Sequence, residues 1–303
     1  MFKALSIVTK ISMENIWRIT LLTNPDICNL RCRLCFLHQR ERPFGMGEMP
    51  WEIAEKAIRG YAQYGLREVI PSTMGEPLLY SQFGKLARLV SDLDLKLNLT
   101  TNGSFPLKGA ERFARELLPI SSDIKVSCWG VKKNSWNVLS PGMDVEAYLK
   151  NLETLACVRR ELSGSSERPL SSLSLQMTVT KTNRGEVPRV LELAASLGFD
   201  RVKLNRAVFL SNAKRRDEEL SPDDFLPASA VQGFPIRVEG TFLRPAGHVL
   251  LFGKCPFPGR ELWILPDGST EPCPDPESRY GSHDAENRCE RCLLFPRNAF
   301  PKG

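Results

Sequence analysis

Three cysteines in one short segment are the first residues of this sequence that could perform chemistry. Cys28, Cys32 and Cys35 have the spacing C-x3-C-x2-C and follow an apolar stretch that predicts a β-strand. Three thiolates so close together can bind three irons of a cubane iron–sulfur cluster and leave the fourth iron open for a substrate or cofactor. Structural zinc sites normally use four protein ligands, so zinc, with His38 as the nearest imidazole, is the weaker alternative.

The composition sets the class of protein that carries these cysteines. The chain has 303 residues, nine cysteines and only three histidines, with 42% hydrophobic and 25% charged residues, as in folded globular proteins. A net charge of +6 is compatible with anionic substrates and does not by itself indicate a nucleic-acid partner. We find no secretory signal and no run of roughly eighteen apolar residues, and therefore expect a cytoplasmic protein without a membrane or nucleic-acid partner. Its thiols are then reduced, which favours metal ligands over disulfides.

Short β-branched runs alternate with segments of helical period from residue 16 to about residue 209. The predicted strands are Trp17–Thr23, Glu68–Pro71, Lys96–Thr101, Asp123–Trp129, Leu173–Thr180 and Arg201–Arg206. The predicted helices are Trp51–Tyr64, Ser81–Leu93, Lys108–Leu117, Val145–Leu162 and Glu186–Leu197. This α/β pattern indicates a parallel sheet in a partial (β/α)6 TIM-like barrel, because a complete barrel needs about 250 residues.

The sequence changes character beyond about residue 232, where Pro, Gly and short strands replace the β/α alternation. Glu261–Leu265 followed by Pro266-Asp267-Gly268 predicts a β-hairpin. We therefore expect a barrel over residues 1–232 and a small β-hairpin-containing domain over residues 233–303. The second domain contains four more cysteines, which by spacing alone are typical of a structural zinc ribbon: Cys255, Cys273, Cys289 and Cys292.

The first cysteine motif, placed after the first strand of a partial β/α barrel, resembles the signature of the radical S-adenosylmethionine (SAM) enzymes. The resemblance implies a [4Fe-4S] cluster held by Cys28, Cys32 and Cys35, with SAM bound to its open iron. Reduction would then cleave SAM to a 5′-deoxyadenosyl radical that abstracts a hydrogen from a substrate. Leu34 departs from the family pattern, which more often has an aromatic there, whereas Phe36 stands where an aromatic commonly meets the adenine of SAM.

Two further segments match the family in the expected order along the chain. Gly75, Glu76 and Pro77 close the second strand and resemble the glycine-rich stretch that contacts the amino group of SAM. Asn102 belongs to a Thr-Thr-Asn-Gly ending of the third strand, at the carboxyl edge where β/α barrels place their active residues. The resemblance therefore implies that both segments border the cofactor.

The fourth predicted strand resembles the family at Ser127, the position that binds the carboxylate of SAM. The alternation of side chains puts Lys125 and Ser127 on one face and Cys128 on the other, so we expect Cys128 to be a buried apolar residue facing the helices. An arginine that often follows the serine is replaced by Leu139. Lys125 or Lys203 are the candidates for neutralising the carboxylate.

Polar residues also interrupt the last two predicted strands of the barrel. Gln176 and Asn205 either face SAM or the substrate, or form hydrogen bonds between strands. In the second domain, a few residues near the cysteines are candidates for a substrate pocket, although surface or packing roles are the simpler interpretation: Arg244, His248, Arg260 and Trp263.

The second cysteine set resembles the twitch or truncated SPASM domain of radical SAM enzymes. This implies one auxiliary [4Fe-4S] cluster, fully ligated by Cys255, Cys273, Cys289 and Cys292, that transfers electrons or supports the fold. The resemblance as a whole implies an enzyme that oxidises or epimerises a small organic molecule and is reduced by a flavodoxin- or ferredoxin-type donor. A peptide or protein side chain as substrate, an iron–sulfur electron carrier and a zinc-ribbon binding protein are the alternatives.

Overall fold

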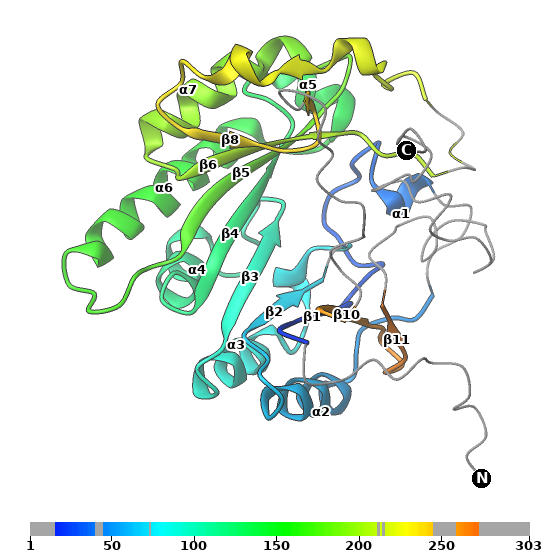
Figure 1. Cartoon of the computed structure of the whole chain (residues 1–303), viewed down its shortest axis with the longest axis vertical. Helices are drawn as coiled ribbons and strands as arrows, with labels where there is room; N and C mark the ends of the chain where they lie inside the picture. The colour runs from blue at the N-terminus through cyan, green and yellow to red at the C-terminus, as the bar shows by residue number, and fades with distance from the viewer. Residues whose placement is uncertain are drawn as a thin grey trace, which may run out of the picture.

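The structure, a computed structural model, describes residues 16–39, 45–72, 74–210, 213, 216–244 and 259–272. Its centre is a nine-stranded sheet with the order β11-β10-β1-β2-β3-β4-β5-β6-β8. Neighbouring strands are parallel throughout this sheet except for the β10–β11 pair. The helices cover one face of the curved sheet (Figure 1). The predicted α/β class with a parallel, partial TIM-like barrel is thereby confirmed.

The six predicted barrel strands and five predicted helices are all present, with ends shifted by a few residues. The strands of the large sheet are β1 Arg18–Leu21, β2 Glu68–Pro71, β3 Lys96–Thr101, β4 Ser121–Cys128, β5 Ser172–Val179, β6 Arg201–Arg206, β8 Arg237–Glu239, β10 Glu261–Ile264 and β11 Thr270–Glu271. The helices are α1 Phe36–Gln39, α2 Trp51–Ala62, α3 Phe83–Asp92, α4 Ala110–Leu117, α5 Lys133–Leu139, α6 Val145–Ser163 and α7 Val187–Leu197. A separate pair, β7 Leu226–Pro227 and β9 Leu243–Arg244, forms a two-stranded sheet.

The core lies between the sheet and its helices, and side-chain alternation along each strand decides which residues enter it. On β4, Val126 and Cys128 are buried in this core at 0% and 2% exposure. Ser127, between them, lines a cavity on the other face of the strand. The predicted burial of Cys128 as a small apolar residue is therefore confirmed.

The predicted hairpin near the C-terminus is also confirmed, as β10 and β11. Strand β10 pairs in parallel with β1, with Trp263 opposite Thr20, so the hairpin extends the barrel sheet. At the other edge β8 pairs with β6. The predicted boundary between residues 232 and 233 stays a prediction, because these strands are only part of the second domain. Several residues singled out in the sequence lie outside the described residues: His248, Cys255, Cys273, Cys289 and Cys292.

The interior of the barrel is closed at its amino-terminal end by paired charges. Arg18 on β1 binds both Glu68 on β2 and Glu261 on β10. On the opposite side, Asp123 on β4 accepts a hydrogen bond from Arg201 on β6 at 2.5 Å. These pairs connect strands that are distant in sequence, and they leave the carboxyl-terminal end of the barrel for a binding site. None of the described helices combines the length and apolarity needed to cross a membrane.

Candidate active site

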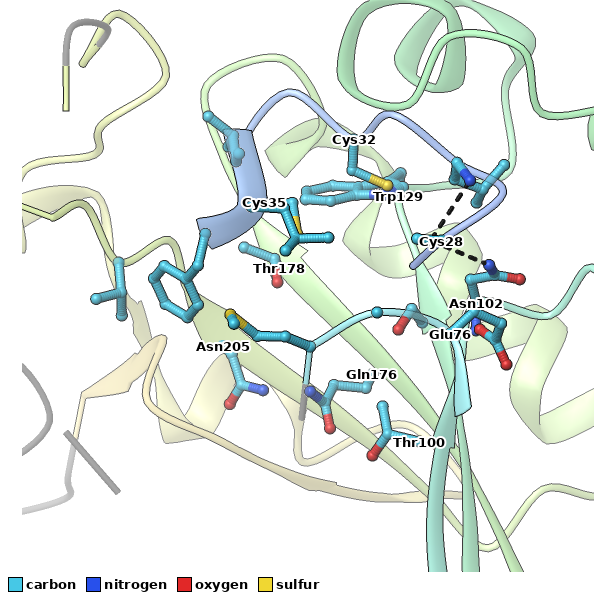
Figure 2. Close-up of a pocket in the computed structure, with 18 of the residues that line it drawn as sticks. Cys28, Cys32, Cys35, Glu76, Thr100, Asn102, Trp129, Gln176, Thr178 and Asn205 are labelled. Atoms are coloured by element: carbon cyan, nitrogen blue, oxygen red, sulfur yellow. Dashed lines mark hydrogen bonds between the residues drawn. The ribbon is translucent and has the colours of Figure 1, made fainter. Parts of the chain in front are cut away.

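The cysteine segment leaves β1 and crosses the carboxyl ends of the parallel strands before entering the short helix α1 (Figure 2). The turn after β2 packs against the start of the cysteine segment. The amide of Asn24 donates to the Glu76 carbonyl at 2.7 Å. Gly75 has φ 74°, and a Cβ there would lie 2.1 Å from the Asn24 carbonyl oxygen and 2.7 Å from that of Ile27. Only glycine fits this close approach, so Gly75 lets the cysteine segment rest on the strand ends.

The three thiols open onto one cavity of about 560 Å³. Polar residues from the ends of several strands lie across this cavity from the cysteine segment (Figure 2). The cavity brings together nearly all site residues predicted in the barrel: Cys28, Cys32, Cys35, Phe36, Gly75, Glu76, Asn102, Ser127, Gln176 and Asn205. Pro77 is outside the cavity lining; it is buried at the start of a 3-10 turn over Pro77–Leu79.

Burial raises the pKa of all three thiols, that of Cys35 to about 12. A bare thiolate is therefore unfavourable here, and a bound metal must displace the proton. No three His, Cys, Asp or Glu side chains in the described ranges are arranged to hold one metal ion. A cubane cluster is larger than an ion and takes each thiolate on a separate iron. Three thiols that open onto one cavity therefore fit three irons of such a cluster.

Glu76 connects the two polypeptide segments that border the thiols. Its carboxylate accepts hydrogen bonds from the Thr101 hydroxyl and the Asn102 backbone, each at 2.8 Å. Burial raises the pKa of Glu76 to about 7 despite these bonds. Asn102 in turn donates to the side chain of Asn29 at 2.9 Å, and its amide nitrogen lies 3.8 Å from the Cys28 sulfur. Glu76 thus orders the end of β3 beside the first cysteine.

The two departures from the family pattern meet in space. Leu34, at the aromatic position, and Leu139, at the arginine position, pack together in one buried apolar cluster with Phe209. The backbone N–H of Arg33 also donates to the Leu139 carbonyl at 2.8 Å. The cysteine segment is therefore held on this side by apolar packing against the end of α5, a helix that the sequence analysis did not predict.

Neither lysine suggested for the SAM carboxylate reaches the cavity, so that expectation is wrong. Lys125 contacts Asn98 and lies 3.7 Å from Asp123, while Lys203 lies 3.5 Å from Glu239. Both lysines belong to the paired charges of the amino-terminal end. They sit two residues before Ser127 and Asn205, which places them about 6.6 Å deeper along their strands.

Other residues of the cavity were missed by the sequence analysis. Arg206, at the end of β6, lines the cavity, and its backbone N–H donates to the Thr241 hydroxyl at 3.1 Å. Trp263 on β10 also lines it; the sequence had already offered this residue as a candidate for a substrate pocket, with packing as the simpler interpretation. Arg206 could have been found from its place as the last residue of a strand, at the carboxyl edge where β/α barrels place their active residues. No local signal indicates that β10 lies beside β1.

Comparison with known proteins decides the family of this site. The sequence profile of the Radical SAM superfamily matches residues 22–158, which include all three cysteines of the cavity. This match assigns residues 22–158 to the radical SAM superfamily. Membership implies a [4Fe-4S] cluster and SAM, and the thiols and polar strand ends around the cavity fit both groups.

Three curated proteins resemble this chain over 56% to 82% of its length. A tungsten-containing aldehyde ferredoxin oxidoreductase cofactor-modifying protein of Pyrococcus furiosus is 21% identical over 250 residues, which are 81% of this chain and 68% of the relative. A probable GTP 3′,8-cyclase of Thermococcus kodakarensis is 27% identical over 173 residues, 56% of this chain and 51% of the relative. A pre-heme d1 synthase of Dinoroseobacter shibae is 26% identical over 263 residues, 82% of this chain and 59% of the relative.

The fold is shared with solved structures. Streptococcus suis SuiB, bound to the precursor peptide SuiA, matches with a TM-score of 0.66 and 13% identity, over 94% of this chain and 66% of SuiB. The AdoMet-bound anSMEcpe matches with a TM-score of 0.57 and 18% identity, over 84% of this chain and 74% of that one. At these identities the likeness shows the fold and leaves the substrate undefined.

Proposed function

We propose that this protein reductively cleaves SAM and uses the resulting radical to abstract a hydrogen from a carbon of a small organic molecule, which is then oxidised or epimerised. The observation that carries the proposal is the single cavity onto which Cys28, Cys32 and Cys35 open together with the polar ends of β3 to β6. An electron carrier needs no such cavity next to its cluster. The bound cluster and SAM would supply a 5′-deoxyadenosyl radical.

The residues of the chain then have separate tasks. Cys28, Cys32 and Cys35 hold the cluster, because they are the thiols that open onto the cavity. Phe36, directly after the third cysteine, offers its ring to the adenine. Ser127 offers a hydroxyl to the carboxylate of SAM. The amides of Gln176 and Asn205 supply neutral donors and acceptors.

Arg206 is the residue that we propose in place of Lys125 and Lys203 as the cation near a carboxylate. It lines the same cavity as Ser127, at the carboxyl end of β6. A guanidinium pairs with a carboxylate through two parallel hydrogen bonds, and both lysines lie at the other end of the barrel.

A small-molecule substrate is favoured by the sequence relatives. By their names, the sequence relatives modify the cofactor of a tungsten-containing oxidoreductase, cyclise GTP and synthesise pre-haem d1. We therefore propose a cofactor precursor or a molecule of similar size. Peptides are also tested as substrates below, since SuiB, which has the same fold, binds one.

We further propose that Cys255, Cys273, Cys289 and Cys292 hold one auxiliary [4Fe-4S] cluster, as in twitch-type domains. Four thiolates leave no iron open, so this cluster would transfer electrons or stabilise the fold. A flavodoxin- or ferredoxin-type protein of the cytoplasm would supply the electrons. Iron and sulfide analysis of a variant with these four cysteines changed to Ala tests this proposal. We expect the variant to hold one cluster fewer than the wild type, and an unchanged iron and sulfide content would contradict the proposal.

The radical chemistry is tested by anaerobic turnover of the iron- and sulfide-reconstituted full chain with SAM and a strong reductant. We expect 5′-deoxyadenosine from the wild type and none from a variant with Cys28, Cys32 and Cys35 all changed to Ala. Small organic molecules and peptides added in parallel should differ in whether they raise the rate. A reconstituted protein that holds no cluster at the three cysteines and does not bind SAM would refute the proposed function.

A further inference from the structure

A hydroxyl from a distant part of the chain reaches the middle cysteine of the motif. The Ser140 oxygen lies 3.1 Å from the Cys32 sulfur, although 108 residues separate them in sequence. Ser140 is fully buried at the end of α5, and its backbone N–H donates to the Trp136 carbonyl at 2.7 Å. The hydroxyl is thus fixed in place beside the sulfur, without access to bulk water.

The direction of this hydrogen bond follows from the state of the sulfur. An iron-bound cysteine is a thiolate, which has no proton and can only accept. The Ser140 hydroxyl must then be the donor. Trp129 lies beside the same sulfur (Figure 2). Burial raises the pKa of the Cys32 thiol, whereas the hydrogen bonds from Ser140 and Trp129 lower it. Both donors come from the segment that follows β4.

The other two sulfurs have different partners. The Cys28 sulfur accepts from the backbone N–H of Leu30 at 3.4 Å and lies 3.8 Å from the Asn102 amide. The Cys35 sulfur accepts from the backbone N–H of Leu37. Backbone donors within the motif come with the loop itself. The Ser140 hydroxyl is independent of the loop and is removed by one substitution.

Resting on the proposed function, we propose that Ser140 is a positioning residue that donates a hydrogen bond to the Cys32 thiolate of the bound cluster and raises its reduction potential. Reduction adds one electron, from [4Fe-4S]2+ to [4Fe-4S]1+, and the electron comes from an external flavodoxin- or ferredoxin-type donor. A donor aimed at a cluster sulfur stabilises the additional negative charge of the reduced form. Ser140 thereby makes the cluster easier to reduce.

The test is an anaerobic redox titration of the reconstituted full chain, followed by electron paramagnetic resonance. The signal of this cluster is identified as the part of the spectrum that disappears when Cys28, Cys32 and Cys35 are all changed to Ala. We expect Ser140→Ala to shift its midpoint to a more negative potential. Ser135→Ala is the matched control, because Ser135 is a buried serine of the same helix whose hydroxyl binds Glu186. That variant should keep the wild-type midpoint.

A second pair of variants separates the hydroxyl from the shape of the side chain. Ser140→Thr and Ser140→Val have the same shape and differ in the hydroxyl, so only Val should shift the midpoint. With a flavodoxin-type donor, Ser140→Ala should cleave SAM more slowly than wild type. Titanium(III) citrate, a stronger reductant, should restore its rate.

Three outcomes would contradict the inference. One is an iron-loaded Ser140→Ala with the wild-type midpoint. Another is an equal midpoint in the Thr and Val variants. The third is loss of the cluster from both Ala and Val while Thr retains it, which would assign Ser140 to holding Cys32 instead. A wild type that binds no cluster would instead refute the proposed function, so the two failures are distinguishable.

Discussion

The two ends of the barrel interior are built from the same strands but differ in their chemistry. At the amino-terminal end, four cations face four carboxylates in two groups of ion pairs. Arg18 pairs with Glu68 and Glu261, and the second group joins Lys125, Arg201 and Lys203 to Asp123 and Glu239. At the carboxyl-terminal end, two residues further along the strands, the inward positions include the neutral Ser127, Gln176 and Asn205 around a cavity.

The difference shows how one sheet serves both stability and binding. Asp123 is 3% exposed, and beside Arg201 it accepts hydrogen bonds from Ser174 at 2.7 Å and Ser172 at 2.9 Å. Such fully paired charges fill the interior and leave no partner for a ligand. The neutral groups at the other end line open space and can exchange water for a ligand at low cost. Substitutions at the two ends should therefore affect different properties.

The largest effect is expected at the cavity end, from Cys35→Ala. One iron of the cluster loses its ligand, so SAM cleavage should fall to the background of the assay. The unfolding free energy of the metal-free protein should change little, because the Cys35 thiol opens onto the cavity and its removal leaves no new enclosed void. Cys157→Ala, at an exposed cysteine of α6, is the control and should retain the wild-type rate. 5′-Deoxyadenosine and iron content are measured for both, and normal cleavage by Cys35→Ala would exclude this cysteine as a ligand.

The next effect is expected at the charged end, from Asp123→Asn. Removing the buried Asp123 carboxylate leaves the half-buried Arg201 with Glu239 alone as countercharge, which should lower the unfolding free energy by about 3 kcal/mol. Denaturant titration of the metal-free protein measures it. Glu55→Gln breaks an exposed ion pair with Arg59 on α2 and should cost no more than about 0.5 kcal/mol. If both substitutions lowered the unfolding free energy equally, the charged end would have no special stabilising role.

Glu76 at the cavity end should make stability depend on pH. Its pKa is raised from 4.5 to about 7 by burial, so the folded state keeps a proton that the unfolded state releases near pH 4.5. Stability is then fully present below pH 4.5 and is lost as the pH rises through 7, by roughly 3 kcal/mol relative to Glu76→Gln. Denaturant titrations of both proteins at pH 5 and pH 8 measure the difference, and parallel pH profiles would contradict it.

The smallest effect is expected from Gln176→Leu, which should weaken SAM binding roughly tenfold through one lost hydrogen bond. Stability should change little, because the amide faces the cavity. Ser174→Ala, two residues earlier on β5, gives the converse result. It loses the hydrogen bond to Asp123, which lowers stability by about 1–2 kcal/mol, and keeps the affinity for SAM. Calorimetric SAM titration and unfolding measure both variants, and an unchanged affinity in Gln176→Leu would place Gln176 outside the SAM site.

Local patterns in the sequence were sufficient for the cysteine motif, the order of the strands and helices, the hairpin at residues 261–271 and the burial of Cys128. Each depends on residues adjacent in the chain or on a fixed period of two or 3.6 residues. Helix α5 was missed because it is only seven residues long and has no side-chain cap. Its sequence lacks a clear helical period.

The tertiary structure alone decided which distant residues meet at the site. The contact of Ser140 with Cys32, the packing of Leu139 on Leu34 and the pairing of β10 with β1 join segments that no local signal connects. The tertiary structure also decided how far along the barrel axis each inward-facing residue lies. Alternation correctly placed Lys125 and Ser127 on one face, but a rise of about 3.3 Å per residue puts one in the charged end and the other at the cavity. Periodicity predicts which face of a strand a side chain occupies. Only the packed barrel determines which neighbours that side chain meets at its position along the strand.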